Sequence, residues 1–400
     1  MQQETGQTRL SSRVQAVRPS PTLNMAEMTR KLRQQGREVI ILSMGEPDFD
    51  TEAFIKEAGI AAIRRNETKY TEVSGTRAFR EALSEKFKRD NAIEYDVDQI
   101  IVSSGLKLIL FNAIYATVDP GDEIIIFEPF YENYGPDAIL SGARPRYVTL
   151  QPPDWTYDSN ELAEAFNSST KAIIINTPNN PTGKVFSRVE LEEIAELCTR
   201  WDCLAITDEI YEHIIFDDKR HISLASLEGM AERTVTINSL SKTYSVTGWR
   251  VGWALARANI TSQIRKVHDF LTVGAPTPFQ RAGVCALNLE EAYYEALRNR
   301  YAQARDRLCE ALIDAGFNLV PPKGAYYIMA EADRLIDQLG GADAYSFCLK
   351  LIHSTGIATV PGTTFYHKAK MGNNQVRFCF AKSQATLEEI CLRLNKLKMT

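Results

Sequence analysis

The chain of 400 residues has no long apolar run, no block of basic residues and no secretory signal. No window approaches the roughly 18 apolar residues that a membrane span requires, so we expect no transmembrane helix. The first 20 residues have no apolar core, which argues against a cleaved leader. The net charge of −5 argues against nucleic acid or an anionic membrane as the main partner.

Cysteine and histidine patterns are also sparse. The seven cysteines contain no Cys-x-x-Cys motif, and the five histidines are scattered without the spacing of metal ligands. We therefore expect reduced, mostly buried thiols in a cytoplasmic protein, and no metal site.

The sequence does contain a regular alternation of short apolar runs and longer amphipathic segments. Short, continuous apolar runs indicate strands that are covered on both faces, and the amphipathic segments between them indicate helices. This order predicts a mostly parallel, seven-stranded α/β sheet wrapped by helices. Strands are expected at 99–104, 122–127, 145–150, 171–176, 203–207, 233–238 and 251–256, and helices at 76–90, 106–117, 158–167 and 187–201.

The pattern changes after about residue 257. A long helical segment, 290–316, ends at Gly316, which is a suitable C-terminal cap, and a smaller α+β portion follows it. We predict a large α/β domain over residues 46–285 and a small domain over 286–400. Residues 1–45 are expected to pack with the small domain.

Ligands of such sheets bind beyond the carboxyl ends of the strands, so the polar residues at these ends are candidates for a site. Gly105 precedes a predicted helix, whose first N–H groups form an anion site, although an ordinary N-cap explains a Ser-Gly pair equally well. Hydroxyls and a guanidinium could join the same anion. The candidate strand-end residues are Ser103 to Gly105, Phe130, Tyr131, Asn176 to Asn180, Asp208, Tyr211 and Ser239 to Lys242.

Lys242 and Asp208 are charged residues next to predicted buried strands. Burial and a nearby cation such as Arg250 would lower the pKa of Lys242 and make its amine nucleophilic. Asp208 must be paired, either in a structural salt bridge or with a protonated ring nitrogen. A single lysine is more often exposed or salt-bridged. In order with Asn180, Asp208 and Tyr211, however, Lys242 is better explained as a Schiff-base lysine.

These motifs, taken together, resemble the class I/II aminotransferases of the fold-type I pyridoxal-phosphate superfamily, and the similarity spans nearly the whole chain. The segments that carry it are SMGEPDFDT (43–51), residues 69–83 and 119–134, NNPTG (179–183), DEIYEHIIF (208–216), SLSKTYSVTGWRVGW (239–253) and VRFCFA (376–381).

The resemblance implies a role for each site residue. Lys242 would form the Schiff base and move the proton between the substrate Cα and the cofactor C4′, while Asp208 would keep the pyridine nitrogen protonated. Tyr211 and Asn180 would bind the ring 3-oxygen, and Tyr131 would stack on the ring. Arg377 would bind the substrate carboxylate, with Asn180 and the Gly45 backbone nearby. The phosphate group is assigned to Ser104, Gly105, Leu106, Lys107, Ser239, Ser241, Arg250 and Tyr70 of the partner subunit.

A homodimer with shared sites follows from the resemblance, as does ping-pong transfer of an amino group to a 2-oxo acid. Leu106 departs from the family by replacing a small residue. The stretch 267–280 has no arginine where dicarboxylate-specific relatives have one, so we expect a neutral, apolar or aromatic amino acid as substrate. Other reactions of the same cofactor, namely β-elimination, racemisation or oxygen-dependent oxidation, stay open. A DNA-binding regulator is disfavoured, because the residues before Leu42 are too few for a winged helix.

Overall fold

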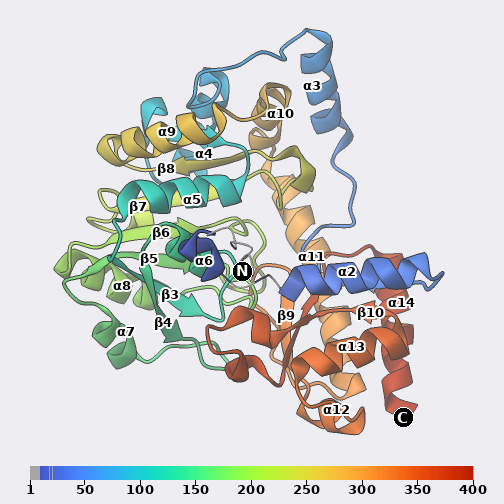
Figure 1. Cartoon of the computed structure of the whole chain (residues 1–400). Helices are drawn as coiled ribbons and strands as arrows, with labels where there is room; N and C mark the ends of the chain where they lie inside the picture. The colour runs from blue at the N-terminus through green and yellow to red at the C-terminus, as the bar shows by residue number, and fades with distance from the viewer. Residues whose placement is uncertain (1–9, 18, 20, 400) are drawn as a thin grey trace, which may run out of the picture.

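The computed structural model describes residues 10–17, 19 and 21–399. A seven-stranded sheet lies at the centre of its larger part (Figure 1). The spatial order is β2-β8-β7-β6-β5-β3-β4, and every pair is parallel except those of β8, which is antiparallel to both neighbours. The prediction of a mostly parallel seven-stranded α/β sheet is therefore confirmed. The strands are β2 (Ile100–Ser103), β3 (Glu123–Glu128), β4 (Arg144–Thr149), β5 (Thr170–Asn176), β6 (Leu204–Asp208), β7 (Thr234–Ser239) and β8 (Gly252–Leu255).

Both faces of this sheet are buried, which explains the continuous apolar runs. Successive side chains of a strand point to opposite faces. Ile124 and Ile126 accordingly join one apolar cluster, whereas Ile125 and Phe127 join another. A strand covered on both sides has no polar face, so its sequence shows no alternation.

Helices that precede, connect or follow the strands along the chain cover the sheet. α4 (Arg77–Asn91), α5 (Leu106–Thr117) and α9 (Ala258–Thr272) contact β2, and α6 (Tyr134–Leu140) and α7 (Ser159–Ala165) contact β4. α8 (Arg188–Arg200) buries Leu191 and Ile194 in the second cluster. α3 (Ala53–Arg64) packs on α10 (Thr277–Leu287), which also contacts α4. The four predicted helices correspond to α4, α5, α7 and α8.

The rest of the chain builds two small sheets around a long helix. α11 (Glu291–Ala315) ends at Gly316 with φ 103°, as expected for a C-terminal glycine cap, and packs on α14 (Gln384–Leu394). β9 (Tyr327–Glu331) and β11 (Val360–Pro361) flank β12 (Gln375–Cys379) in an antiparallel sheet. The other elements here are α12 (Asp333–Gln338), α13 (Ala344–Thr355) and β10 (Ile357–Ala358).

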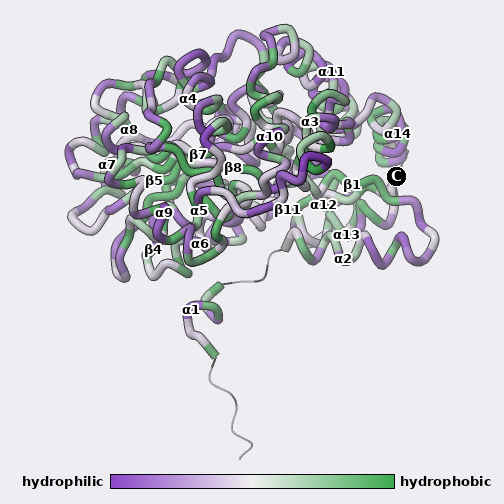
Figure 2. The backbone as a smooth tube through the Cα atoms, turned by 90° about the horizontal axis from the view of Figure 1, so that it is seen from above, coloured by the Kyte–Doolittle hydropathy of each residue, from purple (hydrophilic) through white to green (hydrophobic). Residues whose placement is uncertain are grey.

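The beginning of the chain joins this C-terminal part. β1 (Ile40–Ile41) pairs in parallel with β10, and α2 (Pro21–Gln34) contacts β11. α1 (Ser12–Gln15) instead projects on the side of α6, where Arg13 donates to the Leu140 carbonyl oxygen at 3.4 Å (Figure 2). The domain limits at residues 45 and 285 stay a prediction, and residues 1–9, 18 and 20 of the first segment lie outside the described residues.

Short 3₁₀ segments complete the fold, and they are η1 (Val97–Gln99), η2 (Leu224–Ser226), η3 (Thr247–Trp249), η4 (Gly362–Phe365), η5 (Ala369–Gly372) and η6 (Asn395–Met399). No helix within residues 10–399, as far as these are described, combines the length and apolarity needed to cross a membrane. All seven cysteines are free thiols, and five of them are buried.

Candidate active site

A cavity of about 260 Å³ lies where the carboxyl ends of the parallel strands meet. Residues that follow β3, β5, β6 and β7 form one side of it, and residues 43–45 and the C-terminal part form the other. Most of the predicted site residues come together here. Those in its wall are Gly45, Leu106, Lys107, Tyr131, Asn180, Asp208, Tyr211, Ser241, Lys242, Arg250 and Arg377.

Four predicted residues are not in the wall. Gly105 lies against the Arg250 side chain, and the Ser239 hydroxyl accepts the Ser241 N–H at 3.2 Å, so both border the cavity. Ser104 donates its hydroxyl to the Gly274 carbonyl at 3.1 Å. It lines a separate surface hollow together with Tyr70, which is 90% exposed. A residue assigned to the site of a partner subunit must be exposed in this way.

Lys242 follows β7 by three residues and reaches the centre of the cavity. Its Nζ donates to the Gly45 carbonyl oxygen at 2.6 Å. Burial lowers the pKa of Lys242 to about 8; Arg377 and Arg250 push it the same way, while Cys379 and Glu46 oppose them. At pH 7 about a tenth of the amine is therefore neutral and able to attack a carbonyl carbon.

Asp208 ends β6 and is 2% exposed. Its carboxylate accepts hydrogen bonds from the Tyr134 hydroxyl at 2.8 Å and from the Ile210 N–H at 3.2 Å. Burial raises the pKa of Asp208 to about 6, against the effect of these two donors. Because both donors are neutral, a cationic group in the cavity would stabilise the charged carboxylate further.

Arg377, in β12, faces the cavity from the C-terminal part. Its guanidinium donates to the Asn180 side-chain oxygen and to the Ser43 carbonyl, each at 2.9 Å. The ring centroids of Tyr327 and Phe365 lie 4.4 and 4.9 Å from it. Its Nε is buried and has no hydrogen-bond partner among the described residues. The N–H groups of the guanidinium that these two contacts leave free suit a carboxylate in the cavity.

An anion cradle forms where α5 begins. Gly105 has φ 91°, a conformation that glycine adopts without strain, and α5 starts at the next residue. Gly252 leaves no space for a side chain, since a Cβ there would lie 2.7 Å from the Leu106 nitrogen. The free N–H groups of the first helical turn, the Arg250 guanidinium and the Ser241 hydroxyl together suit a phosphate.

Pyridoxal phosphate fits these residues. It requires a partly neutral amine for its aldehyde, an acid for its ring nitrogen and a cradle for its phosphate, and Lys242, Asp208 and the start of α5 provide these groups within one cavity.

Several residues in the wall, or in contact with it in the case of Tyr326, were not predicted from the sequence. The Tyr134 hydroxyl donates to Asp208, the Tyr327 hydroxyl accepts from the Tyr211 hydroxyl at 3.2 Å, and the Tyr326 hydroxyl donates to the Gly45 carbonyl at 2.9 Å. Tyr134 lies within a segment that resembles the family, so its motif was visible but its role was not. Tyr326, Tyr327 and Phe365 come from distant parts of the chain, and no spacing rule links them to Lys242.

Comparisons with known proteins agree with the site. Residues 37–394 match the model of the aminotransferase class I and II family. The probable N-succinyldiaminopimelate aminotransferase of Mycobacterium tuberculosis is 35% identical over 96% of this chain and 98% of that protein. Human kynurenine–oxoglutarate transaminase 1 is 36% identical over 90% of this chain and 93% of that protein. A solved structure of Thermus thermophilus aspartate aminotransferase with maleate covers 98% of this chain and 100% of its own, with TM-score 0.90 and 33% identity.

These matches span almost the full length of both partners and confirm the family and the cofactor that the motifs predicted. The chain belongs to the class I and II aminotransferases and is a pyridoxal-phosphate-dependent aminotransferase.

Proposed function

We propose that the chain moves the α-amino group of a neutral, apolar or aromatic amino acid to a 2-oxo acid, with Lys242, Asp208 and Arg377 in the principal roles. The observation that carries this proposal is the presence of all three side chains in the wall of one cavity. Bound pyridoxal phosphate supplies an aldehyde that condenses with amines and a ring that withdraws electrons from the substrate Cα.

Lys242 has two tasks in this proposal. Its neutral amine would hold the cofactor covalently, and the same Nζ, once free, would move the proton between the substrate Cα and the cofactor C4′. The Gly45 carbonyl, 2.6 Å away, orients the Nζ atom. Asp208 holds a proton on the ring nitrogen, and the Tyr134 hydroxyl fixes the direction of its carboxylate. Tyr211 and Asn180 bind the ring 3-oxygen, and Tyr131 stacks on the ring.

Different residues bind the cofactor phosphate and the substrate carboxylate. The Gly105, Leu106 and Lys107 backbone, together with Ser104, Ser239, Ser241 and Arg250, binds the phosphate. Arg377 binds the substrate carboxylate, with Asn180 and the Gly45 backbone beside it. The aromatic rings of Tyr327 and Phe365 contact the Arg377 guanidinium and fix the orientation of its plane. A fixed plane favours the two parallel hydrogen bonds of a carboxylate clamp.

The cavity wall determines which substrate side chain the site accepts. Relatives are named for N-succinyldiaminopimelate, kynurenine and aspartate, so the family accepts several classes. Tyr131, Ile210, Tyr327 and Phe365 give the wall an apolar character that favours a neutral side chain. The stretch 267–280 does not enter this wall, and Phe270 within it is 91% exposed.

A panel of amino donors against a few 2-oxo acids tests the preference, with loss of the cofactor absorbance in the first half-reaction as readout. We expect neutral and aromatic donors to react with higher kcat/KM than aspartate and glutamate. Preferred use of the acidic donors would contradict the proposal. Lys107, a further cation in the wall, would then be the residue to replace, because its ammonium is able to pair with a second carboxylate.

A homodimer with shared active sites is the proposed assembly. Tyr70 is 90% exposed and lies outside the cavity of its own chain, so we assign it to the phosphate group of the partner subunit. A second surface hollow, of about 560 Å³, is lined by Phe111, Tyr115, Phe270 and Leu271. Its exposed apolar side chains, among them Tyr115, Phe270 and Leu271, make it a candidate surface for contact with the second subunit.

We also propose domain limits and a cellular location for the chain. Residues 46–285 and 286–400 are taken as the large and small domains, with 1–45 joining the small one, because the strands divide between one large sheet and two small ones. A cytoplasmic location is proposed from the seven free thiols, five of them buried.

A further inference from the structure

Asp208 ends β6, and the turn that follows it carries Tyr211 and is not part of a helix. The Glu209 N–H joins it to β7 by donating to the Ile237 carbonyl at 2.9 Å. The next two backbone hydrogen bonds are local: the Glu212 N–H donates to the Glu209 carbonyl at 2.9 Å, and the Ile214 N–H to the Tyr211 carbonyl at 2.8 Å. Asp208 and Tyr211 line the cavity, whereas Glu209 and Glu212 are buried outside its wall. The side chains of these two glutamates are therefore further points at which the turn contacts the rest of the fold.

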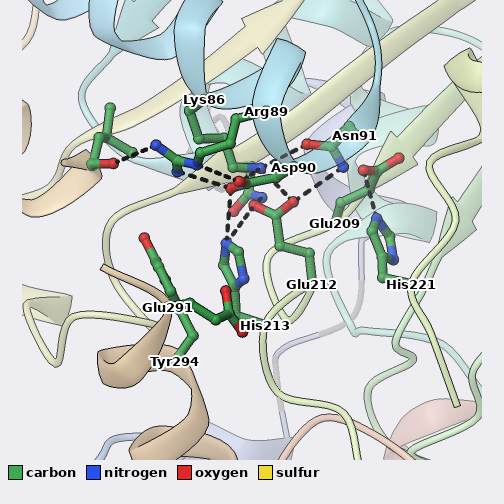
Figure 3. A network of polar contacts seen from close by, with 12 residues as sticks. Lys86, Arg89, Asp90, Asn91, Glu209, Glu212, His213, His221, Glu291 and Tyr294 are labelled. Atoms are coloured by element: carbon green, nitrogen blue, oxygen red, sulfur yellow. Dashed lines mark hydrogen bonds and ion pairs between the residues drawn. The ribbon is translucent and has the colours of Figure 1, made fainter. Parts of the chain in front are cut away.

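Glu212 is bound from two other elements. Lys86 of α4, which is 1% exposed, donates its Nζ to Glu212 Oε2 at 2.5 Å (Figure 3). Asn238 of β7 donates its side-chain N–H to Glu212 Oε1 at 2.6 Å. Burial opposes the charge of Glu212, but Lys86, followed by His213 and His221, keeps its pKa at about 2. The carboxylate is thus charged at neutral pH and joins α4 to β7.

Asn238 continues this connection into the loop that carries Lys242. Its side-chain oxygen accepts the Ser239 N–H at 2.7 Å, and the Ser239 hydroxyl accepts the Ser241 N–H at 3.2 Å. A chain of three hydrogen bonds therefore runs from Glu212 to the residue next to Lys242. It links the side chains proposed for the ring with those proposed for the phosphate and the Schiff base.

Glu209 is the second anchor of the turn. It is fully buried, and its two oxygens contact His221 Nε2 and the Ser223 hydroxyl, each at 2.8 Å (Figure 3). The ligand atoms of Glu209, Glu212 and His221 lie within 4.8 Å of one another, which is close enough for a metal ion. The Lys86 ammonium already neutralises Glu212, and every oxygen of the two carboxylates contacts a donor. The group is better explained as an anchor.

We propose that Glu212 is a positioning residue which, through Lys86 and Asn238, sets the Asp208–Tyr211 turn in register with the Ser239–Lys242 loop. The proposal deepens the function given above and rests on the roles assigned there to Asp208, Tyr211 and Lys242. It predicts that cofactor binding depends on Glu212, although no atom of Glu212 lies in the cavity wall.

Two variants separate positioning from simple stability. Glu212→Gln leaves the buried Lys86 ammonium with only the more distant carboxylate of Asp90, at 3.9 Å, so the melting temperature of the apoprotein should fall. Lys86→Met/Glu212→Leu removes both charges and the acceptor of Asn238, and apolar replacement of a buried pair commonly restores stability. We expect this double variant to melt near the wild type and yet bind pyridoxal phosphate about tenfold or more weakly, as outer partners of ligands commonly do when lost.

The readouts are the dissociation constant of the cofactor by absorbance titration and the pH at which the bound-cofactor absorbance changes. Both should shift in the double variant. If the double variant regains the wild-type dissociation constant and spectral pH together with its melting temperature, the role is structural and the proposal is wrong. Asn238→Ala, which keeps the Lys86–Glu212 pair, should also weaken cofactor binding, and unchanged binding there would contradict the proposal even if the other variants fail to fold.

Asp217→Asn is the matched control. It removes the charge from another ion pair, between the exposed Asp217 and the buried Arg305 at 3.0 Å, on the same chain segment but away from the cavity wall. It should lower the melting temperature without changing the cofactor spectrum. Borohydride reduction of wild-type protein, followed by peptide mapping, tests the assigned role of Lys242 separately. An adduct elsewhere would overturn the proposed function, whereas an adduct on Lys242 with unaltered Glu212 variants would overturn only this inference.

Discussion

Asp208 shows at the residue scale how a functional group is kept at a cost in stability. The sequence indicates that an acid follows a buried strand, and it also indicates that such an acid needs a partner. It does not indicate which partner is present before the cofactor binds. The structure provides two neutral donors, Tyr134 and the Ile210 N–H, and these leave the carboxylate with a raised pKa.

The apoprotein should therefore be more stable without this acid. The native pKa of Asp208, about 6, lies above its ordinary value of 3.8, so the native state binds the proton more tightly than the unfolded chain. The free energy of unfolding consequently falls as the pH rises from about 4 to about 6. Asp208→Asn does not titrate, so its stability relative to wild type should increase by about 2–3 kcal/mol over that interval. Urea unfolding of both apoproteins at a series of pH values measures this difference.

Asp217→Asn gives the opposite sign, because hydrogen bonds from Arg305 hold the pKa of Asp217 at about 2. Its stability relative to wild type should fall as the pH rises from about 2 to about 4, the interval between its native and ordinary pKa values, and should change little above that. Parallel curves for wild type and Asp208→Asn would show that Asp208 has an ordinary pKa and would remove the basis of this prediction.

The residue scale also shows which parts of the site the sequence could supply. Asp208 ends a strand, and Lys242 and Asn180 lie within four residues of a strand end, so strand-end reasoning finds them. Eleven of the residues predicted from motifs lie in the cavity wall. Tyr327 and Phe365 belong to the C-terminal part and reach the wall only through the tertiary fold. Their identity depends on how two sheets are placed, which periodicity and spacing do not encode.

At the scale of elements, β8 is the feature that sequence patterns leave undetermined. Its apolar run predicts a strand correctly, but an apolar run is the same in either direction. Because β8 is antiparallel to its neighbours, its amino end lies at the carboxyl ends of the other strands. This reversal brings Arg250 and Gly252 beside the start of α5, and the chain needs only the short connection 240–251 to make it.

Gly252→Ala tests this contact between elements. A Cβ at Gly252 would lie 2.7 Å from the Leu106 nitrogen and 2.8 Å from the Gly105 carbonyl carbon, and these are backbone atoms that cannot rotate away. The start of α5 must shift, so we expect the affinity for pyridoxal phosphate and for free phosphate to fall about tenfold or more. Isothermal titration of the apoprotein measures both ligands.

Gly248→Ala is the control, since a Cβ at Gly248 meets no atom within 4 Å and the loop there is exposed enough to accept it. Its affinities should equal those of the wild type. Equal affinities for Gly252→Ala would mean that α5 does not hold the phosphate.

For the whole molecule, the proposed dimer makes a prediction about mixed subunits. Lys242→Ala removes the amine of its own site, and Tyr70→Ala removes the group proposed to reach the phosphate of the partner subunit. A mixed dimer of the two contains one site with both wild-type residues. Random mixing should therefore restore about a quarter of the sites.

Co-refolding of the two inactive variants in equal amounts, followed by a transamination assay, measures this recovery. Activity no higher than the mean of the two separate variants would show that Tyr70 does not act across subunits. Light scattering on the wild type gives the mass of the assembly independently.

The pairing of β1 with β10 links Ile40 to Ile357, near opposite ends of the chain. During synthesis, at about 5–20 residues per second, the N-terminal strand waits from roughly 15 s to a minute for its neighbour to leave the ribosome. The central sheet is complete well before that moment. Nascent chains should therefore pass through a stage in which the body has folded while Leu42 and Met25 still lack their final cover, and chaperone capture would be strongest in that interval.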